Sequence, residues 1–328
     1  MLDINNKKLI KNGYRITNKR QITALRIRVP GGSLDVKYFD IIKDIAQKYG
    51  NGKVHITTRQ GFEIPGIPMA KISEINEIIH PILIGMESEI GVSIHNPKTG
   101  YPAAGTRNIS ACIGNNVCPF ANYNTTELSK KIEKLIYPHD FHVKIALTGC
   151  PNDCIKAHMQ DIGVIGMVLP MYDSNRCIGC QACVKNCQKV ATGALTIVNY
   201  KVKRDHLRCI GCGECILKCP VLAWTRGEKY YRMVVMGRTG KKNPRIAQTF
   251  MEWVDETAIL KVIENLYHYI DQFIDRSLPK EHVGYIVDRT GIQVFKDYVL
   301  KDVYIGSLSK IANYMSFSGY GHEKSNYF

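Results

Sequence analysis

The sequence Cys-Ile-Gly-Cys-Gln-Ala-Cys-Val-Lys-Asn-Cys occupies residues 177–187, and its cysteine spacing returns at residues 209–219 as Cys-Ile-Gly-Cys-Gly-Glu-Cys-Ile-Leu-Lys-Cys. Each cysteine of the first copy has a counterpart 32 residues later. The two copies hold eight of the chain's 12 cysteines and lie in a segment of distinct composition, residues 173–224. Strand-like runs at residues 161–169 and 230–236 flank this segment, so we expect it to be an insertion between neighbouring strands of one sheet.

The spacing C-x2-C-x2-C-x3-C in each copy is the one that two-cluster bacterial ferredoxins use. Its short gaps allow one loop to wrap a four-iron cluster with three thiolates. In ferredoxins of this type the fourth cysteine of each run binds the other cluster. The resemblance therefore implies two crossed ligand sets: Cys177, Cys180, Cys183 and Cys219 for one cluster, and Cys209, Cys212, Cys215 and Cys187 for the other. A pair of zinc sites is the alternative, although zinc does not call for a third and fourth cysteine at these intervals.

Hydrophobic periodicity predicts a strand followed by a helix near the start of the chain. Residues 22–30 alternate like a strand and break at the Pro-Gly-Gly of residues 30–32. The helix is expected to begin with Ser33 as its N-cap and to end at Gly50. Its predicted apolar face consists of Val36, Phe39, Ile42 and Ala46.

Further elements follow along the chain. A helix at residues 72–79 is expected to end at Pro81, because proline interrupts helices. Residues 141–147 alternate as a strand, which places the polar side chains of His142 and Lys144 together on one face. The other predicted elements are a strand at residues 53–58, a helix from Thr125 or Thr126 to about Ile136, and a long helix at about residues 256–274.

Four cysteines lie outside the insertion, as a C-x5-C pair followed by a C-x3-C pair: Cys112 and Cys118, then Cys150 and Cys154. Their surroundings read Thr-Arg-Asn-Ile-Ser-Ala-Cys at residues 106–112 and Thr-Gly-Cys-Pro-Asn-Asp-Cys at residues 148–154. Residues 57–61 read Thr-Thr-Arg-Gln-Gly. Together these motifs resemble the sulfite and nitrite reductase family, which couples a four-iron cluster to sirohaem. The resemblance covers nearly the whole chain apart from the insertion.

The resemblance implies an α+β protein that corresponds to one half of a sulfite reductase. Its expected parts are a ferredoxin-like domain at residues 1–90 and a mixed-sheet sirohaem and 4Fe-4S domain at residues 91–172 and 225–315. The two-cluster ferredoxin domain, residues 173–224, interrupts the second part. Residues 316–328, rich in Gly, Ser and aromatic residues, are expected to form a loose tail.

The family resemblance also implies a sirohaem site. In the family, the last cysteine of the set bridges the cluster and the sirohaem iron, and this role falls on Cys154. Such a shared thiolate gives electrons a direct path to the iron that binds substrate. Residues 237–245, Gly-Arg-Thr-Gly-Lys-Lys-Asn-Pro-Arg, resemble the family's carboxylate-binding loop. The implied sirohaem partners are Asn152, Thr58, Gln60, Arg238, Lys241, Lys242 and Arg245.

The activity that the resemblance implies is that of the catalytic subunit of a dissimilatory-type anaerobic sulfite reductase. Reduction of sulfite to sulfide takes six electrons, and fixed cations stabilise the bound anion while its oxygens leave as water. The family motifs assign this role to Arg59 and Arg107, and Lys144 and His142 match positions where the family places basic residues. The alternative for each of them is an ordinary solvated surface charge.

The net charge of +15 and the pI near 9.2 indicate an acidic or anionic partner. Nucleic acid is not expected, because no helix-turn-helix, zinc-finger or aromatic RNA-binding pattern accompanies the charge. No G-x-G-x-x-G motif is present, so electrons must come from another polypeptide. The resemblance implies a flavoprotein subunit that oxidises NADH and an iron-sulfur electron-transfer subunit.

We expect a cytoplasmic protein with no membrane span. No stretch reaches about 20 apolar residues, and twelve clustered thiols indicate a reducing compartment.

Two other functions fit the residues. One is a sirohaem nitrite reductase, because reduction of nitrite to ammonia also takes six electrons. The other is an electron-transfer subunit that holds three [4Fe-4S] clusters and no sirohaem. The sequence also leaves open whether the chain acts alone or completes its site across a homodimer.

Overall fold

The computed structural model describes residues 13–92, 108–137, 139, 141–240, 244–277 and 281–315. The chain forms two compact units. The first unit comprises Met1–Ala111, Thr126–Ile145 and Val262–Lys301, and the second comprises Cys112–Thr125, Ala146–Lys261 and Asp302–Phe328. The predicted tail lies outside the described residues.

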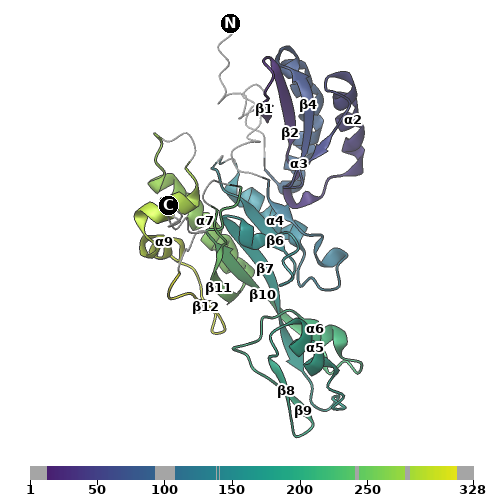
Figure 1. Ribbon diagram of the computed structural model, residues 1–328, viewed down its shortest axis with the longest axis vertical. Helices are drawn as coiled ribbons and strands as arrows, with labels where there is room; N and C mark the ends of the chain where they lie inside the picture. The colour runs from purple at the N-terminus through teal and green to yellow at the C-terminus, as the bar shows by residue number, and fades with distance from the viewer. Residues whose placement is uncertain are drawn as a thin grey trace, which may run out of the picture. The chain divides into compact units, whose positions relative to one another are not determined.

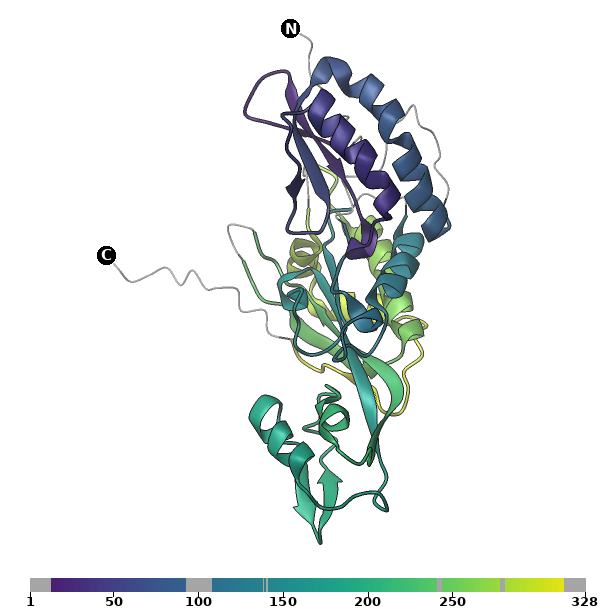
Figure 2. The same ribbon diagram turned by 90° about the vertical axis from the view of Figure 1, so that its right-hand side faces the viewer.

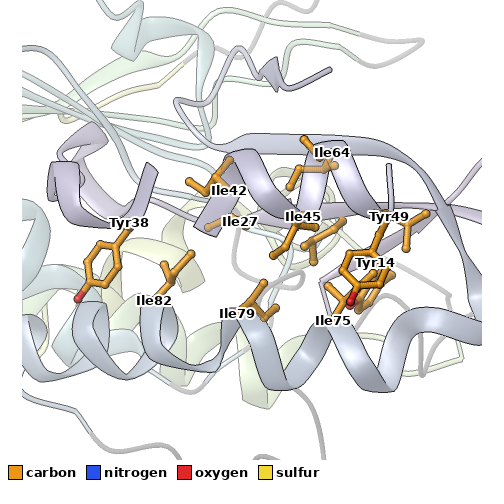
Figure 3. Close-up of a cluster of buried hydrophobic side chains, with 13 residues drawn as sticks. Tyr14, Ile27, Tyr38, Ile42, Ile45, Tyr49, Ile64, Ile75, Ile79 and Ile82 are labelled. Atoms are coloured by element: carbon orange, nitrogen blue, oxygen red, sulfur yellow. The ribbon is translucent and has the colours of Figure 1, made fainter. Parts of the chain in front are cut away.

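The first unit contains a four-stranded antiparallel sheet. Its strand order is β1 (Tyr14–Ile16), β2 (Ile22–Ile27), β4 (Phe62–Pro68), β3 (His55–Ile56). Two helices cover one face of this sheet, α2 (Phe39–Lys48) and α3 (Ile72–Ile90) (Figures 1 and 2). Figure 3 shows their isoleucines meeting side chains of the sheet. Ile45 of α2, Ile75 of α3 and Ile64 of β4 are fully buried, and each buried side chain contributes about 1.5–3 kcal/mol to folding.

The start of α2 differs from its prediction. Asp35, not Ser33, caps the preceding 3-10 turn, because its carboxylate accepts a hydrogen bond from the Lys37 backbone N–H. The α-helix then begins only at Phe39, and Ile42, Ile45 and Ala46 form its buried face. The predicted face was therefore wrong at Val36 and Phe39, whose side chains are 79% and 46% exposed.

Pro81 does not end α3, which was the second error. The helix continues to Ile90 and stops at Gly91, whose φ of +77° suits a left-handed C-terminal residue. Ile79 and Ile82, on either side of the proline, are both buried against the core. This continuous apolar contact offsets the hydrogen bond that the proline cannot make.

The chain also forms a six-stranded sheet. Its strand order is β12 (Lys310–Ile311), β11 (Gln248–Val254), β10 (Trp224–Val235), β7 (Ile162–Tyr172), β6 (Ile145–Thr148), β5 (Ser110–Ala111). Strands β7 and β10 pair antiparallel from Ile162–Val235 to Tyr172–Trp224, as expected of neighbours that flank an insertion.

Four helices complete the two units: α4 (Thr125–Ile136), α7 (Glu256–Phe273), α8 (Val283–Thr290) and α9 (Ile292–Val299). The predictions for α4 and α7 agree with the structure. The shorter 3-10 turns are η1 (Pro30–Gly32), η2 (Val36–Tyr38), η3 (Met69–Lys71), η5 (Gly114–Asn116) and η6 (Ala157–Met159). Within the described residues, no helix combines the length and hydropathy that a bilayer crossing requires.

The predicted strand at residues 141–147 is shorter in the structure, because β6 begins only at Ile145. His142 and Lys144 therefore precede the strand and do not share one of its faces. The predicted strand at residues 53–58 is likewise reduced to β3, and β4 was not predicted. Pro65, Gly66 and Pro68 inside β4 explain that omission, since such residues are depleted in strands.

The insertion leaves the sheet at Tyr172 and returns at Trp224, two residues that pair across β7 and β10. It contains α5 (Ala182–Val190), the hairpin β8 (Leu195–Val198) and β9 (Lys201–Arg204), and α6 (Glu214–Lys218). Figures 1 and 2 show these elements at one end of the β7–β10 ribbon. Their own small core includes Val184, Leu195 and Val202.

Candidate functional site

The second unit brings the four cysteines outside the insertion together. Burial raises the pKa of the Cys150 thiol, and the neighbouring Cys154, Cys118 and Cys112 raise it further. The Gly149 backbone N–H donates to Cys112 Sγ at 3.1 Å. Gly149 is required there, because a Cβ at this position would lie 2.5 Å from the Ala121 Cβ.

Cys154 differs from the rest of this quartet, which is Cys112, Cys118, Cys150 and Cys154. It is exposed, whereas Cys150 is buried and the other two are half-buried. The turn that carries it is held by Asp153, whose carboxylate accepts the Ala157 N–H at 2.6 Å and contacts His158 Nδ1 at 2.7 Å. Cys154 thus has its side chain open to a further ligand while three thiols lie deeper.

Cysteines from the two runs of the insertion lie near one another, while the crossed ligand sets themselves stay a prediction. A small cavity of about 20 Å³ is lined by Cys209, Cys212 and Cys215 of the second run and by Cys187 of the first. Burial raises the pKa of the Cys183 thiol, and the neighbouring Cys219 of the second run raises it further. Among the described residues, no three His, Cys, Asp or Glu side chains are gathered as ligands of a single ion. In a four-iron cluster each thiolate instead binds its own iron, so the neighbourhood of these thiols fits two clusters.

The hydroxyl of Tyr172 lies beside Cys177 and lowers the pKa of that thiol. Hydrogen bonds to cysteine sulfurs also set the reduction potential of an iron-sulfur cluster, because they stabilise its reduced, more negative state. We expect Tyr172→Phe to lower the midpoint potential of the Cys177 cluster by about 40 mV, the equivalent of ~1 kcal/mol for one electron. Potentiometric titration followed by electron paramagnetic resonance measures it. Tyr200→Phe, at an 85% exposed hairpin residue, is the control, and an unchanged potential in Tyr172→Phe would contradict the role.

The first unit holds a cavity of about 240 Å³ with a basic lining. Besides the predicted Arg59 and Thr58, its lining includes Asn108 and one carboxylate, Glu63. The additional cations that line it are Arg15, Arg26 and Arg28, together with His55 if protonated. The excess of cations over carboxylates makes this cavity suitable for a small anion.

Two carboxylates, Glu63 and Glu133, order the cations of this cavity. Glu63 accepts from Arg15 at 2.9 Å and from Arg26 Nε at 2.8 Å. Burial opposes ionisation of Glu63, but these hydrogen bonds hold the pKa of its carboxyl below the usual value. Arg28 pairs with Glu133 of α4, and both side chains are at least 90% buried. The arginines are therefore held in fixed positions before any anion binds.

Arg59 is anchored through backbone carbonyls. Its Nε donates to the Asn108 carbonyl at 3.1 Å and its Nη2 to the Ile145 carbonyl at 2.9 Å. Gln60, with a φ of +62°, uses both ends of its amide on the Ala111 backbone, each at 2.7 Å. Arg59 and Thr58 line the cavity, whereas Gln60 fastens strand β5, and its role toward sirohaem stays a prediction.

The remaining predicted residues of the first unit are Lys144, His142 and Arg107. Lys144 is half-buried. His142 is 9% exposed, and its ring packs edge-to-face on that of His282 with centroids 3.9 Å apart. Arg107 lies outside the described residues.

In the second unit, the predicted carboxylate-binding loop lies next to the turn that follows Cys154. The Thr239 hydroxyl donates to the Met159 carbonyl at 2.8 Å. Arg238 and Arg245 pair through their backbones at 2.8 and 2.9 Å, and both are at least 95% buried. Asn152 is exposed, as is Cys154. Lys241 and Lys242 lie outside the described residues.

Sequence reasoning did not select Arg15, Arg26 and Arg28. The sequence did contain a pattern that could have revealed Arg26 and Arg28. These two arginines alternate with Leu25 and Ile27, whose side chains face the core. Side chains two residues apart in an extended chain project to the same side, and Arg28 directly follows strand β2. The partner Glu133 is 105 residues away in the sequence, so no local pattern could reveal the ion pair.

Comparison with known proteins agrees with this fold and with these motifs. Residues 15–82 match the nitrite/sulfite reductase ferredoxin-like half domain, and residues 103–305 match the nitrite and sulphite reductase 4Fe-4S domain. The chain therefore belongs to the nitrite and sulfite reductase family, and the predicted family and α+β fold are confirmed.

Among individual relatives, the chain is 42% identical over 304 residues to the C subunit of the anaerobic sulfite reductase of Salmonella typhimurium, covering 92% of this chain and 90% of that protein. It is 31% identical over 281 residues to the coenzyme F420-dependent sulfite reductase of Methanocaldococcus jannaschii, covering 84% and 42%. The crystal structure of dissimilatory sulfite reductase I superposes with a TM-score of 0.65 at 17% identity, over 93% of this chain and 77% of that one. At that identity the superposition supports the fold alone.

Proposed function

We propose that this chain is the catalytic subunit of a dissimilatory-type anaerobic sulfite reductase, which reduces sulfite to sulfide with six electrons. The observation that carries the proposal is the quartet in which an exposed Cys154 lies beside three deeper thiols. A bridging thiolate needs one side on its cluster and another side open to a second metal. The 42% identity to one of the chains of an anaerobic sulfite reductase supports the choice of substrate.

The residues of the second unit fit sirohaem. Sirohaem, when bound, supplies an iron at which sulfite is held and reduced. Cys154 would bind that iron and the four-iron cluster through one sulfur. The exposed amide of Asn152 offers donors to the carboxylates of the macrocycle, and Arg238 and Arg245 stay predicted partners of those carboxylates.

In the first unit, the basic cavity would bind the anionic substrate. Arg59 and Arg28 are fixed by bonds to backbone carbonyls and to Glu133, so little reorganisation is needed when an anion binds. Charge-assisted hydrogen bonds from their guanidinium groups would stabilise oxygens that gain negative charge and leave as water. Lys144, His142 and Arg107 stay predicted contributors to the same task.

The proposed complement of cofactors is sirohaem and three [4Fe-4S] clusters, one for each set of four cysteines. The proposed electron source is a flavoprotein subunit that oxidises NADH, acting through an iron-sulfur subunit. The insertion, with eight basic and three acidic residues between positions 173 and 224, suits an acidic donor. The proposed location is the cytoplasm, because a reducing compartment keeps thiols available as metal ligands. Measurement of the oligomeric state will show whether one chain or a homodimer forms the site.

Anaerobic purification followed by iron, sulfide and tetrapyrrole analysis tests the cofactor complement. We expect about twelve iron atoms in three clusters plus one sirohaem iron, and red chlorin-type absorption bands. Three clusters without those bands would identify an electron-transfer subunit instead.

A nitrite reductase is the closer alternative, since a ferredoxin-dependent nitrite reductase of Haloferax mediterranei is 30% identical over 132 residues. Comparing sulfide and ammonia formation with a reduced dye distinguishes the two activities.

A further inference from the structure

The two cysteine runs of the insertion have different surroundings within the second unit. The loop of the second run packs directly on the long strand β7. The Gly211 carbonyl accepts the Val168 backbone N–H at 2.9 Å. A Cβ on Gly211, whose φ is +63°, would lie 2.9 Å from the Met167 Cβ and 3.1 Å from the Trp253 ring. The loop of the second run, which would hold the cluster of Cys209, Cys212, Cys215 and Cys187, therefore lies against the body of the unit.

Asn122 connects that loop to the quartet. Its backbone N–H donates to the Gly149 carbonyl at 2.7 Å, and Gly149 in turn donates to Cys112 Sγ at 3.1 Å. Its side-chain amide donates to the Gly166 carbonyl at 3.3 Å and to the Gly211 carbonyl at 3.4 Å. Gly149 adjoins Cys150 and Gly211 adjoins Cys212, so a single residue is hydrogen-bonded to the ligand loops of both clusters.

Arg226 fixes the orientation of the Asn122 side chain. Its Nη1 donates to Asn122 Oδ1, and its Nη2 donates to the Pro119 carbonyl at 2.9 Å. With the oxygen of the amide used by Arg226, the NH2 group must point to the two glycine carbonyls. The bridge is thus held by the protein in one orientation.

The loop of the first run lies instead against the hairpin of the insertion. A Cβ on Gly179 would meet the Tyr200 carbonyl at 3.2 Å, and Lys201 Nζ donates to the Ser174 and Cys177 carbonyls at 2.6 and 3.1 Å. Cys180 is exposed, and Ile178 is 67% exposed. The loop of the first run, which would hold the cluster of Cys177, Cys180, Cys183 and Cys219, is therefore open to a partner.

We propose that electrons enter at the Cys177 cluster, pass to the Cys209 cluster, and reach the quartet through the Asn122 bridge. Each step would transfer one electron: the donor subunit's iron-sulfur or flavin group would be oxidised, each cluster held by these cysteines would be reduced and reoxidised in turn, and no bond would be made or broken. Tunnelling slows steeply as the distance between donor and acceptor grows and as bonded contacts are lost. This order of transfer rests on the proposed function for its final acceptor.

The test uses the purified, cluster-loaded chain and two variants of Asn122. Asn122→Leu removes all polar contacts of the side chain, and Asn122→Asp keeps the acceptor for Arg226 while removing the donor to Gly211. Each variant is used only if its iron and acid-labile sulfide contents match those of the wild type. If Asn122→Leu incorporates its clusters poorly, Asn122→Asp alone carries the test. The control is Asn116→Leu, an exposed amide in the same segment. The change of midpoint potential expected for Tyr172→Phe identifies which electron paramagnetic resonance signal belongs to the Cys177 cluster.

Two arms separate this inference from the proposed function. In the first, fully reduced protein is mixed with sulfite and frozen at intervals for electron paramagnetic resonance. In the second, no substrate is present, and one electron per protein is introduced by a photoexcited deazaflavin while its transfer from the insertion to the quartet is followed. We expect the Cys209 signal to be reoxidised before the Cys177 signal in the first arm. In both arms we expect Asn122 variants to slow exchange between insertion and quartet at least tenfold.

Transfer at the wild-type rate in loaded Asn122 variants would overturn the bridge, and earlier reoxidation of the marked Cys177 signal would overturn the order. If sulfite reoxidises nothing in the wild type while the second arm still shows slowed transfer in the variants, the proposed function fails and the bridge stands.

Discussion

Replacing Cys154 with serine is expected to abolish sulfite reduction while both inserted clusters stay reducible. A serine hydroxyl is a poor ligand for a metal that prefers thiolate, so the variant should lose both the fourth cluster ligand and the proposed bridge to a second metal. The predicted loss is at least about 10⁴-fold in kcat, because the proposed function routes every electron through this sulfur. The fold should survive, since Cys154 is exposed and its turn is held by Asp153 through Ala157 and His158.

Steady-state assays with a reduced dye measure this loss, and electron paramagnetic resonance of the dithionite-reduced variant counts the clusters that remain. Cys180→Ser is the matched comparison, because Cys180 is also exposed but belongs to the insertion. That variant should lose electron entry from the partner subunits and keep dye-driven turnover. Normal dye-driven turnover in Cys154→Ser would refute the bridging role.

Replacing Arg59 with glutamine is expected to lower kcat/KM for sulfite by about 10²–10³, with all metals retained. The substitution removes a fixed cation from the basic cavity, so both anion binding and stabilisation of departing oxygens weaken. Arg59→Lys should recover only part of the activity, because an ammonium cannot reproduce the planar fork that reaches both the Asn108 and Ile145 carbonyls.

Two further measurements separate a role in substrate handling from a structural one. Thermal unfolding of Arg59→Gln reports the loss of the two carbonyl contacts, and iron analysis reports the clusters. Arg20→Gln is the control, since Arg20 is an exposed cation of the same unit outside the lining of the cavity. Loss of cluster iron in Arg59→Gln, or a kcat/KM equal to that of Arg20→Gln, would show that Arg59 does not act on the substrate.

The sequence predicted those features that depend on spacing and on periodicity. The repeat at 177–187 and 209–219 placed eight cysteines in one insertion, and the structure puts its ends on paired residues of β7 and β10. Helices α4 and α7 were predicted because their apolar stripes are long and regular. The quartet was predicted by local motifs whose four thiols the structure gathers.

The errors arose where tertiary contacts outweigh local preference. Pro81 was expected to end α3, but buried isoleucines on both sides of it keep the helix packed on α2. His142 was placed on a strand by alternation alone, whereas the structure packs its ring against His282, which is 140 residues away in the sequence. The role of Asn122 could not be foreseen, because it depends on Gly149, Gly166 and Gly211, which lie in three separate segments of the chain.

Full reduction of sulfite at the centre defined by Cys154 is the activity that we propose for this chain. The most direct test supplies anaerobically purified, sirohaem-loaded protein with a reduced dye and counts dye oxidised against sulfide formed. We predict one sulfide for every six electrons consumed, and no such product from Cys154→Ser. Ammonia from nitrite with negligible sulfide from sulfite, in the same loaded protein, would contradict it.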